Sequence, residues 1–472
     1  MDENKKLFGG AHSVMMASRA TRGERTEKPT RWIWYVFFAA ILVRGGVAGV
    51  CLAQFREDPD AYRAIATTLS QSGVFGLTGP DGGTRPTAFR PPLYPYLLSW
   101  TTSDVVPVAV LHTLLGAATA VMVFLAAFHA FGDQRVGAFA AAWVIVDPVL
   151  LQQSTLVMTE TLAVALVSAT LYRISVAVRH GFDWKQSVFI GVLLALAYLC
   201  RPTFLVWAVL IIAGLLWAGY RRAFSSTRTR WVPSVVVTII IAGTMGLWMM
   251  RNERAVGHPM WATTHGGYTL LLANNPMFYD HLRSERSRQV WDAQSFLDAY
   301  DHRYEGDPTT ESFWKENWAA AGDPIYPSDT TEVNDDRLCG AAAKALIARQ
   351  PAMFVWSCFV RVWSLWTPFP HVTPTRSAAA TFAIGGYYLA FAGAVLVGLW
   401  RWRQSSVPWR TTLFWSIAAM VVTLSAVHAV YWSNLRMRAP AIPGLAIIAG
   451  ACLYAVDRNR NPEGAKTDVA DL

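Results

Sequence analysis

Residues 55–100 read FREDPDAYRAIATTLSQSGVFGLTGPDGGTRPTAFRPPLYPYLLSW and directly follow an apolar run long enough to cross a bilayer. The pattern DAYRAIATTLSQSG within this stretch predicts an amphipathic helix, which glycines then end. Three acids precede the helix core, at Glu57, Asp58 and Asp60, and Arg90 follows it at the start of the stiff RPPLYP (90–95). Acids, a polar loop and an arginine held by prolines at a membrane surface predict a site and not a plain connection.

Composition places the rest of the chain in a membrane. The 472 residues are 53% hydrophobic and only 15% charged, and they include 21 tryptophans, a residue enriched at membrane interfaces. The net charge of +9 fits the Lys and Arg excess of cytoplasmic loops, and no soluble segment carries a basic patch with interleaved aromatics. We therefore expect the chain to lie in a lipid bilayer and to bind no nucleic acid. The five cysteines show no CxxC spacing, so neither a zinc site nor a redox pair is indicated.

The sequence predicts an all-α polytopic membrane protein of about ten transmembrane helices. Apolar runs of about twenty residues match a hydrocarbon core of about 30 Å. They lie near 32–54, 105–130, 136–152, 156–177, 186–200, 203–220, 232–250, 379–400, 411–431 and 440–456.

Lys and Arg placement predicts the orientation and the domains. Residues 1–31 are basic and are expected to be a disordered cytoplasmic segment, and the tail 457–472 lies on the same side. The transmembrane module 32–250 then places its first loop, 55–104, outside. Residues 251–351 hold 15 acids against 10 Lys and Arg and are expected to form an outer helical subdomain. Within 352–456, the short run 352–368 is expected to be re-entrant or interfacial, so that the basic segment after residue 400 stays inside.

Carboxylates are the first candidate site residues. Asp58 and Asp60 could simply cap the following helix, or they could act on a substrate. Glu160 is expected at membrane depth, where a carboxylate is costly unless it faces a protein interior or a wet cavity. An interfacial residue reaching water is the alternative for Glu160. Asp147, before Pro148, could be merely a turn acid.

Arginines at membrane borders are the second group. Arg44 and Arg361 fall inside apolar runs, where a guanidinium needs an anion, either a carboxylate or a phosphate. Pairing within the bundle is the plain alternative. The rule of positive cytoplasmic loops does not account for five arginines at the predicted outer border, which favours anion binding there. These five are Arg90, Arg201, Arg251, Arg436 and Arg438.

A Gly- and Asn-rich stretch follows the run ending near residue 250. It contains His265, Asn274 and Asn275, which could make ordinary turns or line a site for a hydroxyl-rich ligand. The histidines have no metal-ligand spacing, and the chain has no Ser-His-Asp order, Walker motif or nucleotide fingerprint.

Taken together, these motifs resemble the GT-C membrane glycosyltransferases, in particular the protein mannosyltransferase, aminoarabinose transferase and RgtA-like group. The resemblance rests on Asp58 four residues before Tyr62, on YxxIAxxLxxxG (62–73), and on RPPLYP (90–95). Later landmarks are Thr159-Glu160, Arg201-Pro202, Arg251-Asn252, Asn274-Asn275-Pro276 and RMRAP (436–440). The group often has Asp-Glu at the start of the loop, whereas Pro59 follows Asp58 here, which leaves the assignment between Asp58 and Asp60 open.

The resemblance implies a GT-C-like bundle that transfers a sugar from a polyprenyl-phosphate donor to a hydroxyl of a glycan, lipid or protein. The reaction would invert the anomeric centre at the extracytoplasmic face of the cell (plasma or inner) membrane. Asp58 would be the general base, with Asp60 as the competing candidate. Arg90 would contact the departing phosphate, helped by Arg201 or Arg436.

The remaining roles are also implied by the resemblance. Glu160 would hold the acceptor or a divalent metal ion beside Asp58, because some relatives bind a metal there and others do not. Substrate contacts are expected from the outer-face residues Tyr62, Tyr94, Arg251, His265, Asn274, Asn275 and Arg438. A transporter or lipid-linked sugar flippase is the runner-up, although the chain shows no repeat. A non-catalytic scaffold would leave the border arginines unexplained.

Overall fold

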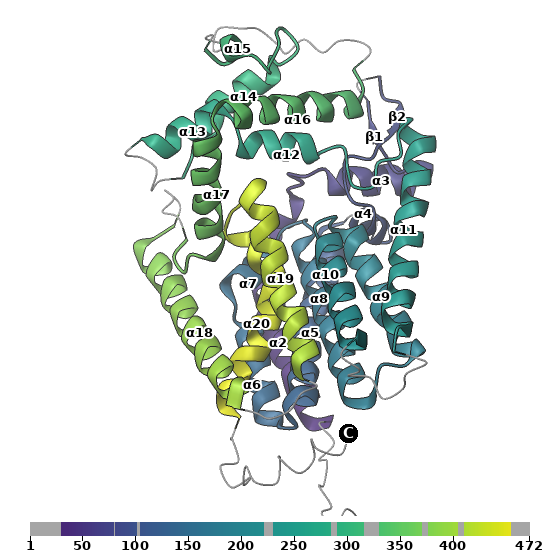
Figure 1. The fold of residues 1–472 in the computed structure, drawn as a ribbon, viewed down its shortest axis with the longest axis vertical. Helices are drawn as coiled ribbons and strands as arrows, with labels where there is room; N and C mark the ends of the chain where they lie inside the picture. Colours follow the sequence, from purple (N-terminus) through teal and green to yellow (C-terminus); the bar gives the residue numbers. More distant parts are fainter. Residues whose placement is uncertain are drawn as a thin grey trace, which may run out of the picture.

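The computed structural model is a helical bundle capped at one end by a layer of shorter helices (Figure 1). It describes residues 30–79, 81–101, 104–220, 230–284, 290–315, 330–370, 376–404 and 410–454. The expected cytoplasmic segment 1–31 and tail 457–472 lie almost wholly outside the described residues.

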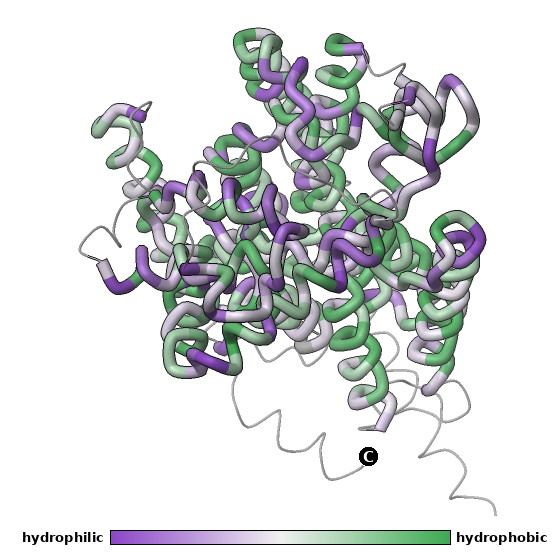
Figure 2. The backbone as a smooth tube through the Cα atoms, turned by 90° about the horizontal axis from the view of Figure 1, so that it is seen from above, coloured by the Kyte–Doolittle hydropathy of each residue, from purple (hydrophilic) through white to green (hydrophobic). Residues whose placement is uncertain are grey.

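Six of the helices in these ranges are long and apolar enough to cross a membrane, and two shorter apolar helices accompany them. Seen from above in Figure 2, much of the backbone is hydrophobic, and hydrophilic segments interrupt it. The all-α polytopic prediction is therefore confirmed, and the chain is a multi-pass membrane protein. The six are α2 (Thr30–Val50), α5 (Val105–Phe131), α8 (Glu160–His180), α11 (Val232–Val256), α18 (Ala378–Gln404) and α19 (Arg410–Val430); the two are α9 (Trp184–Cys200) and α10 (Phe204–Tyr220).

Two of the ten expected spans are not single long helices. The run 136–152 breaks into α6 (Gln134–Ile145) and α7 (Pro148–Gln153), because Pro148 starts a new helix whose N-cap is Asp147. The run 440–456 contributes η3 (Leu435–Ala441), α20 (Ile442–Gly450) and η4 (Ala451–Leu453). Every residue of α20 except Leu445 is buried in the protein core, so protein rather than lipid surrounds it.

The first loop folds as predicted around one amphipathic helix. After η1 (Leu52–Arg56) comes α3 (Tyr62–Ser72), which ends at Gly73 in the left-handed conformation (φ 72°) that glycine adopts freely. A two-stranded antiparallel sheet then pairs β1 (Gly76–Thr78) with β2 (Thr84–Pro86). Pro91 and Pro92 lead into the short α4 (Leu93–Ser99), and Pro95 lies in its first turn.

The capping layer follows α11 and has its own small core. Leu270 and Leu271 of α12 pack with Ala342 and Ala343 of α16, and a Cβ on Gly267 would lie 1.8 Å from the Asp336 carbonyl oxygen. That close approach requires glycine. The layer comprises α12 (Gly266–Ala273), α13 (Pro276–Arg283), α14 (Gln294–Asp301), α15 (Glu311–Lys315) and α16 (Glu332–Arg349).

The segment expected to be re-entrant or interfacial forms α17 (Pro351–Trp366). Its 16 residues are about 24 Å long, shorter than a hydrocarbon core of about 30 Å. In Figure 1 it descends from the capping layer, and α18 continues toward the opposite end of the bundle.

Candidate active site

Asp60 and Arg90 pair across the first loop. Arg90 donates from Nε to the Asp60 backbone carbonyl at 2.7 Å and from Nη2 to Asp60 Oδ1 at 2.8 Å. The guanidinium also lies over the rings of Phe89 (4.3 Å) and Tyr62 (5.5 Å). The Arg90 side chain is 11% exposed and that of Asp60 24%, so the pair is sheltered but reachable.

Asp58 has a different environment. Its Oδ1 accepts from the backbone N–H of Arg63 at 3.1 Å and its Oδ2 from that of Ala64 at 2.9 Å. Both oxygens therefore cap the first turn of α3, as expected of an acid at a helix start. The structure thus realises the capping alternative for Asp58 and brings Asp60, not Asp58, to Arg90.

Glu160 is the centre of a second charged cluster. It starts α8 and is 2% exposed, and its Oε1 lies 3.1 Å from Arg201 Nη1 and 3.9 Å from Arg436 Nε. The other contacts of these arginines are weak acceptors, because Arg201 reaches Met437 Sδ at 3.2 Å and Arg436 reaches Met158 Sδ at 2.8 Å. One buried carboxylate therefore faces two guanidinium groups, which leaves one positive charge in excess.

Tyr62 joins the two clusters. It is 5% exposed, and its ring lies 5.3 Å from that of Tyr94. Burial raises the pKa of Tyr62 well above its ordinary value, and the charges that act on it are those of Arg90, Asp60, Arg201 and Glu160. Of the acids and border arginines singled out in the sequence, the structure gathers Asp60, Arg90, Glu160 and Arg201 around Tyr62, and Arg436 joins them through Glu160.

Tyr94 is a buried support and not an open contact. Its hydroxyl bonds to His112 Nε2 at 2.8 Å, and His112 Nδ1 bonds to the Ser154 carbonyl at 3.0 Å. Since Nδ1 must donate to a carbonyl, Nε2 accepts and the Tyr94 hydroxyl donates. This chain ties the first loop to the segment just before Glu160.

His428 of α19 was not singled out from the sequence. It is 6% exposed, its Nδ1 donates to the Trp432 carbonyl at 2.9 Å, and no described residue bonds to its Nε2. The charges acting on its ring are those of Arg201, Glu160 and Arg436, so it belongs to the same cluster. The only sequence signal was a histidine eight residues before Arg436.

The loop that carries Arg90 is clamped from two sides. Glu332, in the first turn of α16, accepts from the Thr87 hydroxyl at 2.5 Å and from the Ala88 N–H at 2.6 Å. Arg251 donates to the carbonyls of Thr87 (2.6 Å) and Phe75 (2.8 Å). Arg251 was expected to bind an anion, yet in the structure it bonds to backbone carbonyls of the first loop. Glu332 was not predicted from the sequence, because only the fold brings residue 332 to residue 88.

His265 lies beside the charged site, and the neighbouring asparagines Asn274 and Asn275 lie outside it. The His265 ring packs against Phe89 and Tyr268, each at 4.8 Å, and burial together with the charge of Arg90 lowers its pKa to about 3. Asn275 caps α13 by accepting from the Phe278 N–H at 2.8 Å. Asn274 donates to the carbonyls of Leu270 and Val430. Both asparagines are fully buried and hold backbone.

Three further arginines donate to carbonyls at helix C-termini, where the last four C=O groups lack helical partners. Arg44 donates to Val144 and Leu150, Arg361 to Ala273 and Ala429, and Arg438 to Leu365 and Thr367. No ion pair joins any of the three to an acid within the described ranges. An anion was expected for these arginines, and the carbonyls explain how the bundle tolerates them without one.

A divalent ion between Asp58 and Glu160 does not fit these surroundings. Asp58 caps a helix with both oxygens and Glu160 faces two cations, which would repel a metal. In the part of the chain that the structure describes, no three His, Cys, Asp or Glu side chains gather as a metal site.

Residues 90–248 match the family described as dolichyl-phosphate-mannose-protein mannosyltransferase. In fold, the Archaeoglobus fulgidus oligosaccharyltransferase in its apo form is similar, with a TM-score of 0.51 and 14% identity over 90% of this chain. The structure therefore has a GT-C-like fold. The GT-C family resemblance predicted from its motifs is thereby confirmed.

The similar solved structures are longer chains of low sequence identity. The chain spans about half of the oligosaccharyltransferase, 50% of its length, and at 14% identity the likeness shows the fold alone. ArnT from Cupriavidus metallidurans bound to undecaprenyl phosphate is also similar, at a TM-score of 0.38 and 15% identity, over 90% of this chain and 76% of ArnT. A comparison with curated proteins gives no match. The family match includes Arg90, Glu160 and Arg201 but not Asp58, Asp60 or Arg436.

Proposed function

We propose that this GT-C protein transfers a sugar from a polyprenyl-phosphate donor to a hydroxyl acceptor, with inversion, at the extracytoplasmic face of the membrane. The observation that carries the proposal is the Glu160 cluster. It is a buried site with one positive charge in excess, because Glu160 offsets only one of Arg201 and Arg436. A sugar phosphodiester carries a single negative charge and suits such a site.

The donors of the two arginines support phosphate binding. Arg201 Nη1 and Arg436 Nε are buried and lack well-aligned hydrogen bonds to any described residue. Guanidinium groups match phosphate oxygens with several N–H donors in a planar fork. As the C1–O bond breaks, the phosphate gains a second negative charge, so these cations stabilise the transition state more than the bound donor lipid.

Asp60 is the better candidate for the base. It lies in the site beside Arg90 and Tyr62, with Oδ2 outside the contact to Arg90, whereas both Asp58 oxygens are occupied at the helix start. Asp60 would take the proton of the acceptor hydroxyl while that oxygen attacks C1. The bonding electrons of the broken C1–O bond remain on the phosphate, which leaves as polyprenyl phosphate.

Charge placement supports the outer face. The 21 residues of α8 are about 30 Å long, so Glu160 and Arg179 lie at opposite membrane borders. The Arg179 end also carries Arg173 and Lys185, and Arg401 and Arg403 end α18 at the same end of the bundle (Figure 1). Because basic residues favour the cytoplasmic side, the site and the capping layer would face away from the cytoplasm.

The test is turnover of purified protein with undecaprenyl-phosphate hexoses and pentoses, with free undecaprenyl phosphate followed by mass spectrometry. We expect its release in the presence of an acceptor, and a loss of release in Arg201→Ala. A transporter would leave every lipid intact, which would overturn the proposal. Recovery of a product with retained configuration would overturn the single-base mechanism.

A further inference from the structure

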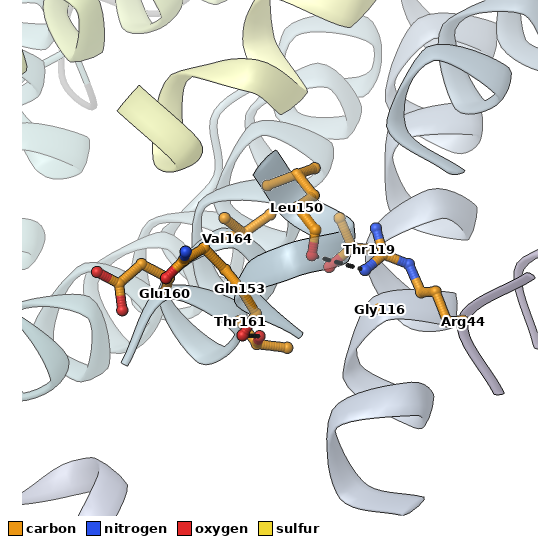
Figure 3. Close-up of a pocket in the computed structure, with 8 residues that line it drawn as sticks. All are labelled: Arg44, Gly116, Thr119, Leu150, Gln153, Glu160, Thr161 and Val164. Atoms are coloured by element: carbon orange, nitrogen blue, oxygen red, sulfur yellow. Dashed lines mark hydrogen bonds between the residues drawn. The ribbon is translucent and has the colours of Figure 1, made fainter. Parts of the chain in front are cut away.

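Polar side chains of the capping layer border the Asp60–Arg90 pair, and the reaction proposed above does not use them. The Glu160 cluster is a separate part of the site. Figure 3 shows the Glu160 carboxylate turned away from Gln153, and its Oε1 faces the two arginines proposed to hold the phosphate. The Asp60 carboxylate instead reaches the capping layer through Arg90 and the residue before it. This second part of the site is available for the acceptor.

A row of packed rings runs from Arg90 into the capping layer. The Arg90 guanidinium lies 4.3 Å from the centre of the Phe89 ring, and the His265 ring lies 4.8 Å from that of Phe89. Tyr268, in the first turn of α12, stacks on His265 at 4.8 Å with 27° between the ring planes. Tyr300 of α14 meets the Tyr268 ring at 4.9 Å and nearly edge to face. In Figure 1 α12 lies between α16 and the bundle, and these contacts fix its first turn beside the first loop.

The rings of His265 and Tyr268 are packed, but their polar atoms have no partner. Both side chains are partly exposed, and no described residue bonds to the His265 ring nitrogens or to the Tyr268 hydroxyl. Because the pKa of His265 is lowered to about 3, its neutral ring has one donor and one acceptor nitrogen. Burial raises the pKa of Tyr268, and the charges of Arg90 and Asp60 also act on its hydroxyl. Two neutral groups that both donate and accept therefore lie near the candidate base.

These groups match hydroxyls better than ions, because a hydroxyl also donates and accepts. An anionic acceptor would need a cation, whereas Arg90 is already paired with Asp60 and residues 251–351 hold 15 acids against 10 Lys and Arg. A serine or threonine side chain offers one hydroxyl, which Asp60 would take. A sugar residue has further hydroxyls for His265 and Tyr268.

We propose that His265 and Tyr268 form an acceptor subsite that binds a sugar residue. Two sugar hydroxyls bond to the His265 imidazole and to the Tyr268 hydroxyl. A third hydroxyl is presented to Asp60, whose Oδ2 lies outside the contact to Arg90. The acceptor is thus a glycan and not a protein side chain or a phosphorylated lipid. This inference rests on the proposed function, because it names the acceptor of that reaction.

The first test measures binding and needs no turnover. The probes are the methyl glycosides of mannose, glucose, galactose and arabinose, with acetyl-threonine amide as the probe that has one hydroxyl. Saturation-transfer NMR on the protein in nanodiscs reports which of them bind. We expect signals from at least one glycoside. Its affinity should fall about fivefold in Tyr268→Phe and in His265→Phe, as for loss of one hydrogen bond.

Tyr96→Phe is the matched control for the loss of a hydroxyl. Tyr96 of α4 is 45% exposed, and its ring stacks on Phe75 as that of Tyr268 stacks on His265. We expect this variant to bind the glycoside as wild type does. The absence of any glycoside signal, or an equal loss in Tyr268→Phe and Tyr96→Phe, would overturn the subsite.

The second test uses turnover with the glycoside that binds. Tyr268→Phe should raise the KM for the glycoside about fivefold and leave the KM for the lipid donor unchanged, because the hydroxyl contacts only the acceptor. A raised donor KM with an unchanged glycoside KM would place Tyr268 on the donor side and would overturn the assignment.

The two tests distinguish this inference from the proposed function. Glycoside signals that depend on Tyr268, without release of undecaprenyl phosphate from any donor, would contradict the proposed function and support the subsite. Release of undecaprenyl phosphate with acetyl-threonine amide and with none of the glycosides would support the proposed function and overturn the glycan acceptor.

Discussion

Replacing Glu160 by glutamine perturbs the charge balance of the site most directly. Arg201 Nη1 and Arg436 Nε lie 3.1 and 3.9 Å from one carboxylate oxygen, so these nitrogens are at most about 7 Å apart. At that separation and an effective dielectric constant of about 20, two positive charges repel by about 2 kcal/mol. The carboxylate offsets this repulsion in the free protein, and glutamine cannot.

Two opposite effects follow from this repulsion. The free Glu160→Gln protein should be less stable by about 2–4 kcal/mol, somewhat below the loss for breaking a fully buried pair, since the Arg436 side chain is 31% exposed. A bound phosphate relieves the repulsion and no longer competes with Glu160. Affinity for undecaprenyl phosphate should therefore rise about tenfold, because about 1.4 kcal/mol corresponds to that factor.

The assay is thermal unfolding in nanodiscs over a range of undecaprenyl phosphate concentrations, because a ligand stabilises the state that binds it. Glu160→Gln should start from a lower midpoint and gain more from the lipid than wild type does. Glu253→Gln makes the same change of net charge at an exposed position of α11 and should change neither value. Lower or unchanged affinity in Glu160→Gln would refute the view that Glu160 and phosphate share the two arginines.

Four further predictions concern the first loop and the capping layer. Asp60→Asn should reduce turnover about a hundredfold or more, as expected for loss of a general base. Asp58→Asn should mainly lower the free energy of unfolding by about 1 kcal/mol, because it removes a helix cap. The opposite pattern would return the base role to Asp58. Arg90→Ala should cost about a hundredfold in turnover, while Arg85→Ala, at the exposed ion pair with Asp81, should be nearly silent; equal effects would remove Arg90 from the site. Glu332→Ala should lower turnover by loosening the Thr87–Arg90 segment, with partial rescue by Glu332→Gln, which still accepts from the Ala88 N–H; no rescue would argue against the clamp. Because the pKa of His265 falls from 6.5 to about 3 on folding, its contribution to stability is full above pH 6.5 and is lost as the pH drops toward 3, so His265→Phe should flatten the acid limb of an unfolding titration.

The sequence predicts the bundle well because apolar length is a strong signal. Helices α2, α5, α8 and α11 lie where apolar runs predict them. The segment after Ala439 was harder to predict, because α20 is short and apolar but is enclosed by protein. An apolar run has the same composition whether lipid or protein surrounds it. Pro148 was the visible reason for the break within 136–152.

The site could be predicted only in part from the sequence, because the type of a residue does not show which group it contacts in the fold. Arg201 and Arg251 both follow apolar helices, yet one meets a buried glutamate and the other meets carbonyls of the first loop. The sequence could not distinguish the roles of Asp58 and Asp60, which are two positions apart. The structure distinguishes them, because Asp58 caps the start of α3. Glu332 and His428 join the site through contacts far apart in sequence, which one chain read alone does not predict.

The central claim is that the first-loop pair and the Glu160 cluster form one phosphate site. Cryo-electron microscopy of the full chain in nanodiscs with undecaprenyl phosphate tests it most directly. We predict the phosphate within hydrogen-bond distance of Arg201 and Arg436, with the Asp60 carboxylate opening onto the same cavity. A phosphate bound away from these arginines, with Glu160 still paired to both, would contradict the account.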